Sequence, residues 1–80
     1  MITVYVRLFA TLRRHFPDLQ VGETMPVELP EGATVGQLIE HLGLPAGEVK
    51  TVFVNNRIRE MESPLVEGDK VGIFPPVGGG

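Results

Sequence analysis

The residues that most clearly indicate a chemical role are three glycines at the C-terminus, Gly78, Gly79 and Gly80. Glycine loses more backbone entropy on ordering than any other residue and has no side chain to pack. Three glycines are therefore a poor end for a packed domain, but they form a thread that can enter a channel too narrow for side chains. The group at its end is the α-carboxylate of Gly80, which reacts only when its oxygen becomes a leaving group. We therefore expect a partner enzyme to activate Gly80.

The residues before the glycines favour an extended exit from the domain. Pro75 and Pro76 fix φ and stiffen the chain, and Val77 follows them. Residues 75–80 reach roughly 20 Å when fully extended. We expect a folded domain over residues 1–74 and a tail over 75–80 that is disordered in isolation. A frayed terminus without function is the competing explanation.

The rest of the chain lacks the side-chain patterns that catalyse reactions by themselves. There is no cysteine, which excludes a disulfide scaffold, a thiol nucleophile and thiolate-bound zinc. His15 and His41 have no acidic ligand pattern around them, so we expect structural or solvated roles and no metal site. The acidic residues near the predicted hairpin are expected to form a solvated surface; they are Glu60, Glu62, Glu67 and Asp69. We expect that the chain is not an enzyme by itself and binds no cofactor.

Length and charge restrict the class of protein further. Eighty residues suffice for one small domain, and a hydrophobic content of 42% suits a compact protein. A net charge of −3 does not favour nucleic-acid binding, which usually needs a basic surface. No apolar run is long enough to span a membrane, and the N-terminus lacks a signal-peptide pattern. We expect a cytoplasmic protein without nucleic-acid or membrane partners.

Hydrophobic periodicity indicates the elements in the first part of the chain. Residues 2–8 alternate strictly and predict a half-buried strand. Residues 9–16 change to helical spacing, with Phe9, Leu12 and Phe16 recurring along one face. We therefore expect a short helical turn directly after the first strand.

The middle of the chain predicts a second strand and the main helix. The strand at residues 25–29 contains Pro26, which cannot donate a ladder hydrogen bond and therefore favours the edge of a sheet. Thr34 and Gln37 form a capping box at the start of the helix, and Gly43 suits its C-terminal end. The helix carries one apolar stripe, made of Val35, Leu38, Ile39 and Leu42.

Three further strands complete the predicted domain. They lie at residues 51–55, 57–59 and 71–74, with a hairpin turn at Asn55 and Asn56. One main helix packed on one face of a mixed sheet of four to five strands is an α+β arrangement. The element order predicts a β-grasp fold, in which the first and last strands pair in parallel at the centre. A split βαβ arrangement would need a second full-length helix, which the sequence does not supply.

The face of the sheet opposite the helix is a second candidate site. If the first and last strands are neighbours, Tyr5 and Phe74 come close together, and Phe53 joins them. An apolar cluster on this face has no partner in a two-layer domain and is typical of a protein interface. The predicted polar rim consists of Arg7, Arg57 and Arg59. The alternative is that each aromatic side chain packs only on its strand neighbours.

Taken together, these residues resemble the ubiquitin-like sulfur carriers, in particular the small subunits of molybdopterin synthase and, more distantly, the thiamine-pathway carriers. The resemblance covers the full length of the chain. Its specific motif is Phe74–Gly80, and the supporting motifs are Leu8–Ala10, Thr34–Leu38 and Glu67–Val71. The family ends in two glycines, which fall on Gly79 and Gly80, and the residue before them, commonly alanine, is Gly78 here.

The resemblance implies a mechanism that agrees with the tail. An adenylating enzyme uses ATP and Mg²⁺ to join AMP to the carboxylate of Gly80. A sulfur donor protein then displaces AMP and leaves a C-terminal thiocarboxylate. The tail enters the large subunit of molybdopterin synthase, where the sulfur is transferred to a precursor pterin. Gly80 is then the covalent carrier, Gly78 and Gly79 provide clearance, and the partner supplies the acid and base groups.

Other uses of the same tail stay open. The same chemistry serves thiamine, tRNA thiolation or cysteine synthesis on a carrier, although the Phe-Pro-Pro-Val run favours the pterin. A protein modifier would instead join Gly80 to a lysine through an isopeptide bond. A plain interaction module would tolerate the deletion of Gly79 and Gly80, whereas both carrier and modifier would lose function with the fold preserved.

Overall fold

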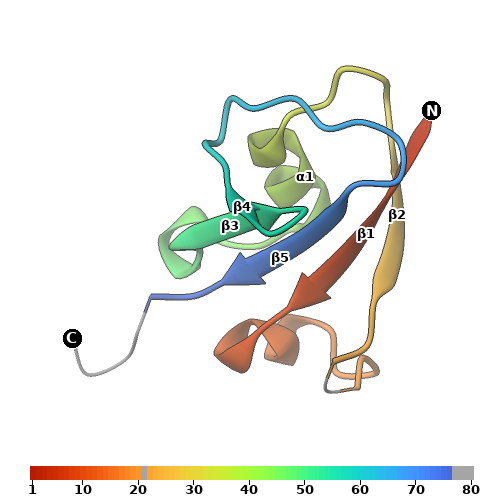
Figure 1. The fold of residues 1–80 in the computed structure, drawn as a ribbon. Coiled ribbons are helices and arrows are strands. Elements are labelled where there is room, and N and C mark those ends of the chain that lie inside the picture. The colour runs from red at the N-terminus through yellow and green to blue at the C-terminus, as the bar shows by residue number, and fades with distance from the viewer. Residues whose placement is uncertain (21, 77–80) are drawn as a thin grey trace.

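The computed structural model describes residues 1–20 and 22–76 (Figure 1). Five strands form one sheet in the order β2-β1-β5-β3-β4; they are β1 (Ile2–Leu8), β2 (Met25–Leu29), β3 (Thr51–Val54), β4 (Arg57–Ile58) and β5 (Lys70–Phe74). The helices are α1 (Val35–Leu42) and two 3-10 helices, η1 (Ala10–His15) and η2 (Ala46–Glu48). The predictions for Val77, Gly78, Gly79 and Gly80 lie outside the described residues. Within the described ranges, no helix combines the length and apolar character needed to cross a membrane.

The pairing of the strands confirms the predicted β-grasp. β1 and β5 run parallel in the middle of the sheet, with Val6 opposite Val71 and Leu8 opposite Ile73. The other strand pairs are antiparallel. β2 lies at an edge of the sheet, as Pro26 predicts. Proline has no N–H to donate to a neighbouring strand, and at an edge one side of the strand needs no hydrogen bonds.

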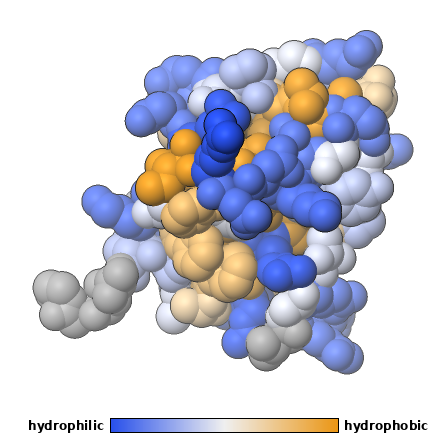
Figure 2. Space-filling model, in the orientation of Figure 1, coloured by the Kyte–Doolittle hydropathy of each residue, from blue (hydrophilic) through white to orange (hydrophobic). Residues whose placement is uncertain are grey.

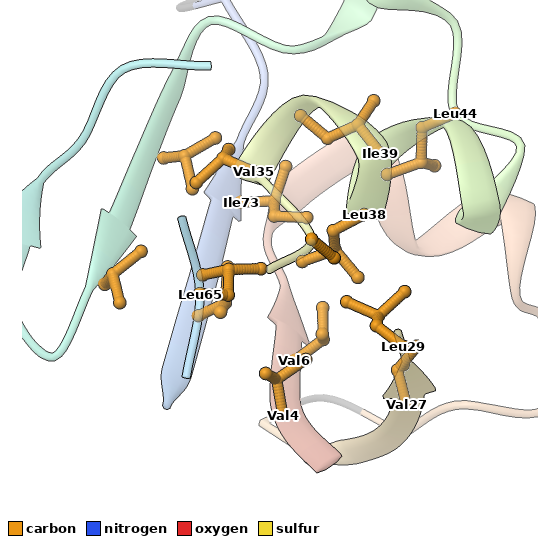
Figure 3. Packing of buried hydrophobic residues seen from close by; sticks show 14 of the residues in the cluster. Val4, Val6, Val27, Leu29, Val35, Leu38, Ile39, Leu44, Leu65 and Ile73 are labelled. Carbon is orange, nitrogen blue, oxygen red and sulfur yellow. The ribbon is translucent and has the colours of Figure 1, made fainter. Parts of the chain in front are cut away.

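A hydrophobic core fills the space between the sheet and α1 (Figure 3). Alternate residues of β1 and β5 point into it, among them Val4, Val6 and Ile73, each fully buried. α1 contributes Val35 and Leu38 from its apolar stripe. Burying one such side chain stabilises the fold by about 1.5–3 kcal/mol, so the contacts of this inner face hold α1 against the sheet.

The turns follow the predicted local signals. The N–H of Gln37 donates to Thr34 Oγ1 at 3.2 Å, and the N–H of Thr34 donates to Gln37 Oε1 at 2.9 Å, which confirms the capping box. Gly43 ends α1 with a φ of 73°. Asn55 and Asn56 have φ values of 52° and 70°, as a two-residue hairpin turn requires.

The segment after β1 differs from the predicted helical turn. Leu12 is buried and Phe16 packs against the core, but Phe9 does not share their face. Phe9 keeps an extended backbone, with φ −115° and ψ 150°, and Ala10 is left-handed with φ 53°. The ring of Phe9 lies instead against Phe74 on the outer face of the sheet. Its predicted place beside Leu12 is therefore wrong, because the helix begins one residue later.

The turn before β5 is built around a buried carboxylate. Asp69 is only 6% exposed, and its two oxygens accept hydrogen bonds from Asn55 Nδ2 and from the N–H of Val66, each at 2.9 Å. The N–H of Lys70 donates in turn to Asn55 Oδ1 at 3.1 Å. The prediction of a solvated surface is wrong for Asp69, because its carboxylate satisfies donors that the turn would leave unpaired. It holds for Glu60 and Glu62, which are exposed. Glu67 is exposed as well, but its Oε1 accepts a hydrogen bond from the N–H of Thr3 at 2.9 Å.

Candidate functional site

The outer face of the sheet carries an open groove with aromatic side chains at the end of β5. The ring of Phe74 stacks on Phe9, with centroids 4.1 Å apart and an interplanar angle of 5°. Phe53 meets Phe74 edge-on, at 5.4 Å and 76°. Both geometries are favourable for aromatic pairs. The three rings, all half-buried, form the aromatic end of the groove.

Gly72 lies beneath these rings and permits their approach. A Cβ added at Gly72 would lie 3.2 Å from Phe9 Cε2 and 3.5 Å from Phe74 Cε1. Arg7 and Phe53 are its partners in the neighbouring strands, so Gly72 occupies the centre of the outer face. A glycine within a strand often marks a close approach of another group to the backbone, and here that group is a pair of stacked rings.

The other end of the groove is polar and basic. Tyr5, Arg7 and Lys70 line it, together with Thr24 and Asn56. Tyr5 lies opposite Lys70 in the β1–β5 register, four residues along the strand from Phe74. The prediction that Tyr5 and Phe74 come close together is therefore wrong, although both side chains line the same groove. Tyr5 is 39% exposed. Figure 2 shows apolar surface beside strongly hydrophilic side chains on this side of the molecule.

The β3–β4 hairpin places Ile58, and not the predicted arginines, beside the aromatic end. Ile58 is the register partner of Phe53, and cross-strand partners share a face. Ile58 is 67% exposed and extends the apolar surface. Arg57 and Arg59 have the opposite side-chain phase, and the N–H of Arg59 donates to the carbonyl of Val52 at 2.9 Å. The structure therefore does not bring Arg57 and Arg59 to the predicted rim, whereas Arg7 does line the groove.

The chain leaves the sheet at the end of β5 (Figure 1), and Phe74, the last residue of β5, belongs to the aromatic end of the groove. The N–H of Phe9 donates to the carbonyl of Ile73 at 3.2 Å, and the N–H of Lys50 donates to the carbonyl of Phe74 at 2.8 Å. Pro75, which follows, has no N–H to continue the ladder. Pro75 is half-buried and Pro76 is exposed, so the predicted tail begins where the groove ends.

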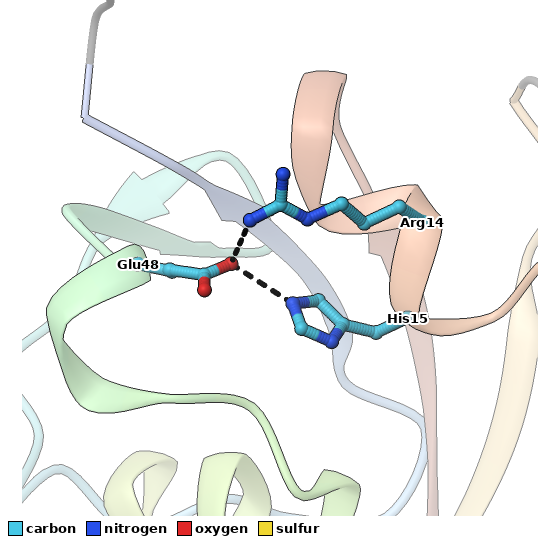
Figure 4. Close-up of polar contacts among 3 residues, drawn as sticks. All are labelled: Arg14, His15 and Glu48. Carbon is cyan, nitrogen blue, oxygen red and sulfur yellow. Dashed lines mark hydrogen bonds and ion pairs between the residues drawn. The ribbon is translucent and has the colours of Figure 1, made fainter.

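A polar cluster joins η1 to η2 (Figure 4). Glu48 Oε1 accepts hydrogen bonds from His15 Nε2 at 2.9 Å and from Arg14 Nη2 at 3.3 Å. The hydrogen bond from His15 and the positive charge of Arg14 hold the pKa of Glu48 below its ordinary value. His41 is exposed in the last turn of α1. Within residues 1–20 and 22–76, no group of three or more acidic or histidine side chains could hold a metal ion.

The chain matches a known protein family over most of its length. The profile of the ThiS family matches residues 6–80. Among curated proteins, none matches the chain. A solved structure named molybdopterin converting factor, subunit 1, from Pyrococcus furiosus is 33% identical, covers 96% of this chain and 100% of its own, and has a TM-score of 0.76.

Two further solved structures share the fold. Small archaeal modifier protein 1 from Haloferax volcanii is 22% identical, with coverage of 96% of this chain and 100% of its own and a TM-score of 0.76. The other is a complex of subunits 1 and 2 of the molybdopterin-converting factor from Helicobacter pylori 26695. Its matching chain is 21% identical, with coverage of 99% of this chain and 100% of its own and a TM-score of 0.63. At these identities the likeness establishes the ubiquitin-like β-grasp fold alone.

Proposed function

The chain belongs to the ThiS family, and from this premise we propose that it carries sulfur on the carboxyl group of Gly80. The proposed destination is molybdopterin, with this chain as the small subunit of a molybdopterin synthase. The observation that carries the proposal is the aromatic groove beside the point where the chain leaves the sheet, together with a family match that extends to residue 80.

The proposed reaction takes place on the last residue and uses groups supplied by partners. A carboxylate oxygen of Gly80 attacks the α-phosphate of ATP in an adenylating enzyme, and pyrophosphate leaves. The terminal sulfur of a persulfide on the donor protein then attacks the carbonyl carbon of the acyl-adenylate, and AMP leaves with the bonding electron pair. A thiol of the donor system cleaves the resulting acyl disulfide, so that the donor is left as a disulfide and Gly80 as a thiocarboxylate. The resulting thiocarboxylate transfers its sulfur to the precursor pterin, and water restores the carboxylate. In this proposal ATP and Mg²⁺ belong to the activating partner, and this chain supplies no acid or base.

The groove is the proposed docking surface for these partners. Phe53 and Phe74 offer apolar area that is already arranged for contact, and Phe9 and Ile58 extend it. Large aromatic side chains in such clusters commonly dominate the binding energy of an interface. Pro75 and Pro76 would then lead the tail away from the docked surface into the partner. Gly78 and Gly79 would pass through a channel that side chains could not enter.

The pterin destination is supported by the one reported structure above 30% identity. The Pyrococcus furiosus protein, at 33% identity, is named as subunit 1 of a molybdopterin converting factor. The Helicobacter pylori structure holds subunit 1 together with subunit 2. We propose an equivalent large-subunit partner for this chain.

The decisive experiment is the intact mass of the chain after incubation with its activating enzyme, ATP and a sulfur donor. We expect a mass gain equal to sulfur replacing oxygen, located in the C-terminal peptide. A chain without Gly79 and Gly80 is the matched control and should stay unchanged while remaining folded. An unchanged mass in the wild type with a competent activating enzyme would refute sulfur carriage.

A protein modifier is the second candidate, favoured by the likeness to small archaeal modifier protein 1. It requires the same adenylation of Gly80, but the acyl group passes to a lysine amine instead of taking up sulfur. Conjugates of higher mass in lysate, lost on deletion of Gly79 and Gly80, would support this function. Thiocarboxylate without conjugates would support the carrier. Sulfur uptake with no transfer to a pterin would favour a thiamine, tRNA or cysteine destination.

A further inference from the structure

The end of β5 is contacted by the residue directly before η1, Phe9, and by a residue two positions after η2, Lys50. η1 follows Phe9, whose N–H donates to the carbonyl of Ile73 at 3.2 Å and whose ring stacks on Phe74. η2 leads toward β3 through Lys50, whose N–H donates to the carbonyl of Phe74 at 2.8 Å. Phe74 is thus contacted at its ring by the residue before η1 and at its carbonyl by a residue shortly after η2. Phe9 and Lys50 therefore both contact the residue from which Pro75 leaves the sheet.

Glu48 connects these two helices (Figure 4). It is the last residue of η2, and its two donors, Arg14 and His15, lie in the last turn of η1. Both hydrogen bonds end on the same oxygen, Oε1, at 3.3 and 2.9 Å. The side chains of His15 and Glu48 are 26% and 33% exposed, whereas that of Arg14 is 65% exposed. The contact between His15 and Glu48 is therefore the better shielded of the two.

We propose that Glu48 is a positioning residue that bridges η2 to η1, fixes the end of β5 and aims the chain beyond Phe74 at the partner's channel. The proposal rests on the proposed function, because it needs a tail that acts inside a partner. A tail that already points into the channel loses less orientational freedom on docking. When only a fraction of the molecules has a competent orientation, the apparent dissociation constant rises by the inverse of that fraction.

The test compares two substitutions that change the net charge equally. Glu48→Gln keeps the size of the side chain but removes its charge, and Glu31→Gln does the same in the exposed turn before α1. The full-length chain is incubated with the activating enzyme, ATP and sulfide, and initial rates of thiocarboxylate formation give kcat and the KM for the chain. We expect Glu48→Gln to raise KM about twofold to fivefold with kcat unchanged, as suits a partly exposed ion pair. Glu31→Gln should match the wild type.

A second measurement is independent of sulfur chemistry. Hydrogen-exchange protection of the Lys50 amide reports its bond to the carbonyl of Phe74, and we expect it to fall about twofold to fivefold in Glu48→Gln alone. Unchanged protection would overturn the proposal, and so would lost protection with an unchanged KM, which would make Glu48 a structural contact only. A wild type that is never converted would instead refute the proposed function. The protection of Lys50 would then still decide whether Glu48 fixes the end of β5.

Discussion

The two faces of the sheet come from the same strands but carry different kinds of side chain. On β5, Val71 and Ile73 point toward α1 and are buried, whereas Gly72 and Phe74 point away and are partly covered. The inner face is aliphatic and closed by a helix, while the outer face is aromatic and basic and forms a groove. Strict alternation thus separates residues that determine the fold from residues that are available for binding. The two sets should respond differently to substitution.

The largest effect should come from the inner face. Ile73→Ala removes a fully buried side chain at the centre of the sheet and should lower the free energy of unfolding by about 2–5 kcal/mol. A domain of this size has only about 4–12 kcal/mol in total. Urea denaturation measures the loss, and Ile73→Val, at about 0.5–1.5 kcal/mol, is the graded control. A loss below that of the valine variant would mean that the core is less tightly packed than the structure indicates.

The outer face should show the reverse pattern. Phe53→Ala removes one edge-on ring contact and should cost stability only about 1 kcal/mol. In a docking groove, however, it should weaken binding to the large subunit by about 2 kcal/mol, close to 30-fold, as calorimetry would measure. Glu28→Ala is the control, since Glu28 has the same outward phase on β2 but does not line the groove. If Phe53→Ala lost no more binding free energy than Glu28→Ala, the groove would not be the docking surface.

Asp69 tests whether a charged residue can stabilise the fold in the same way as the buried residues of the inner face. It is charged but buried, and it accepts two hydrogen bonds. Asp69→Ala leaves Asn55 and the N–H of Val66 without their acceptor and should cost about 1–3 kcal/mol of stability. Asp69→Asn, which keeps one acceptor oxygen, should cost less. If Asp69→Ala had the same free energy of unfolding as the wild type, water would be shown to replace the carboxylate without penalty.

The smallest effect should be the pH dependence from Glu48. Its pKa is lowered in the folded chain by the hydrogen bond from His15 and the charge of Arg14, so its contribution is fully present above its ordinary pKa. That contribution is lost as the pH falls through the lowered pKa of Glu48. The difference in Tm between wild type and Glu48→Gln should therefore shrink as Glu48 becomes protonated in acid. A difference that grows on acidification would contradict the assigned hydrogen bonds.

Most of the fold was predictable because local signals agreed with the overall arrangement. Alternation in β1, the capping box at Thr34 and the paired asparagines after β3 each act within a few residues of the chain. The start of η1 was harder to predict, because the left-handed Ala10 is not a residue that favours positive φ. η2 was missed as well, because three residues are too few for a periodic pattern.

The groove was predicted in part, and its missed members follow from pairing. Phe9 continues the outward phase of Tyr5 and Arg7, so extending the alternation of β1 would have found it. Ile58 follows from the two-residue turn, which makes it the partner of Phe53. The same turn pairs Arg57 with the inward-facing Val54, so the face of Arg57 could have been predicted from the register as well. The predicted roles of these side chains stay predictions until binding is measured.

The parallel pairing at the centre of the sheet has a kinetic consequence. Tyr5 lies opposite Lys70, so strands from opposite ends of the described chain must meet before the central ladder closes. Contacts between such distant residues cost loop-closure entropy before they contribute any stability, and a high contact order slows folding. The groove draws together β1, β3 and β5, so it is complete only once that ladder has formed. A partner that recognises the groove would therefore bind only chains in which the central ladder has formed, so the topology excludes incompletely folded chains from binding.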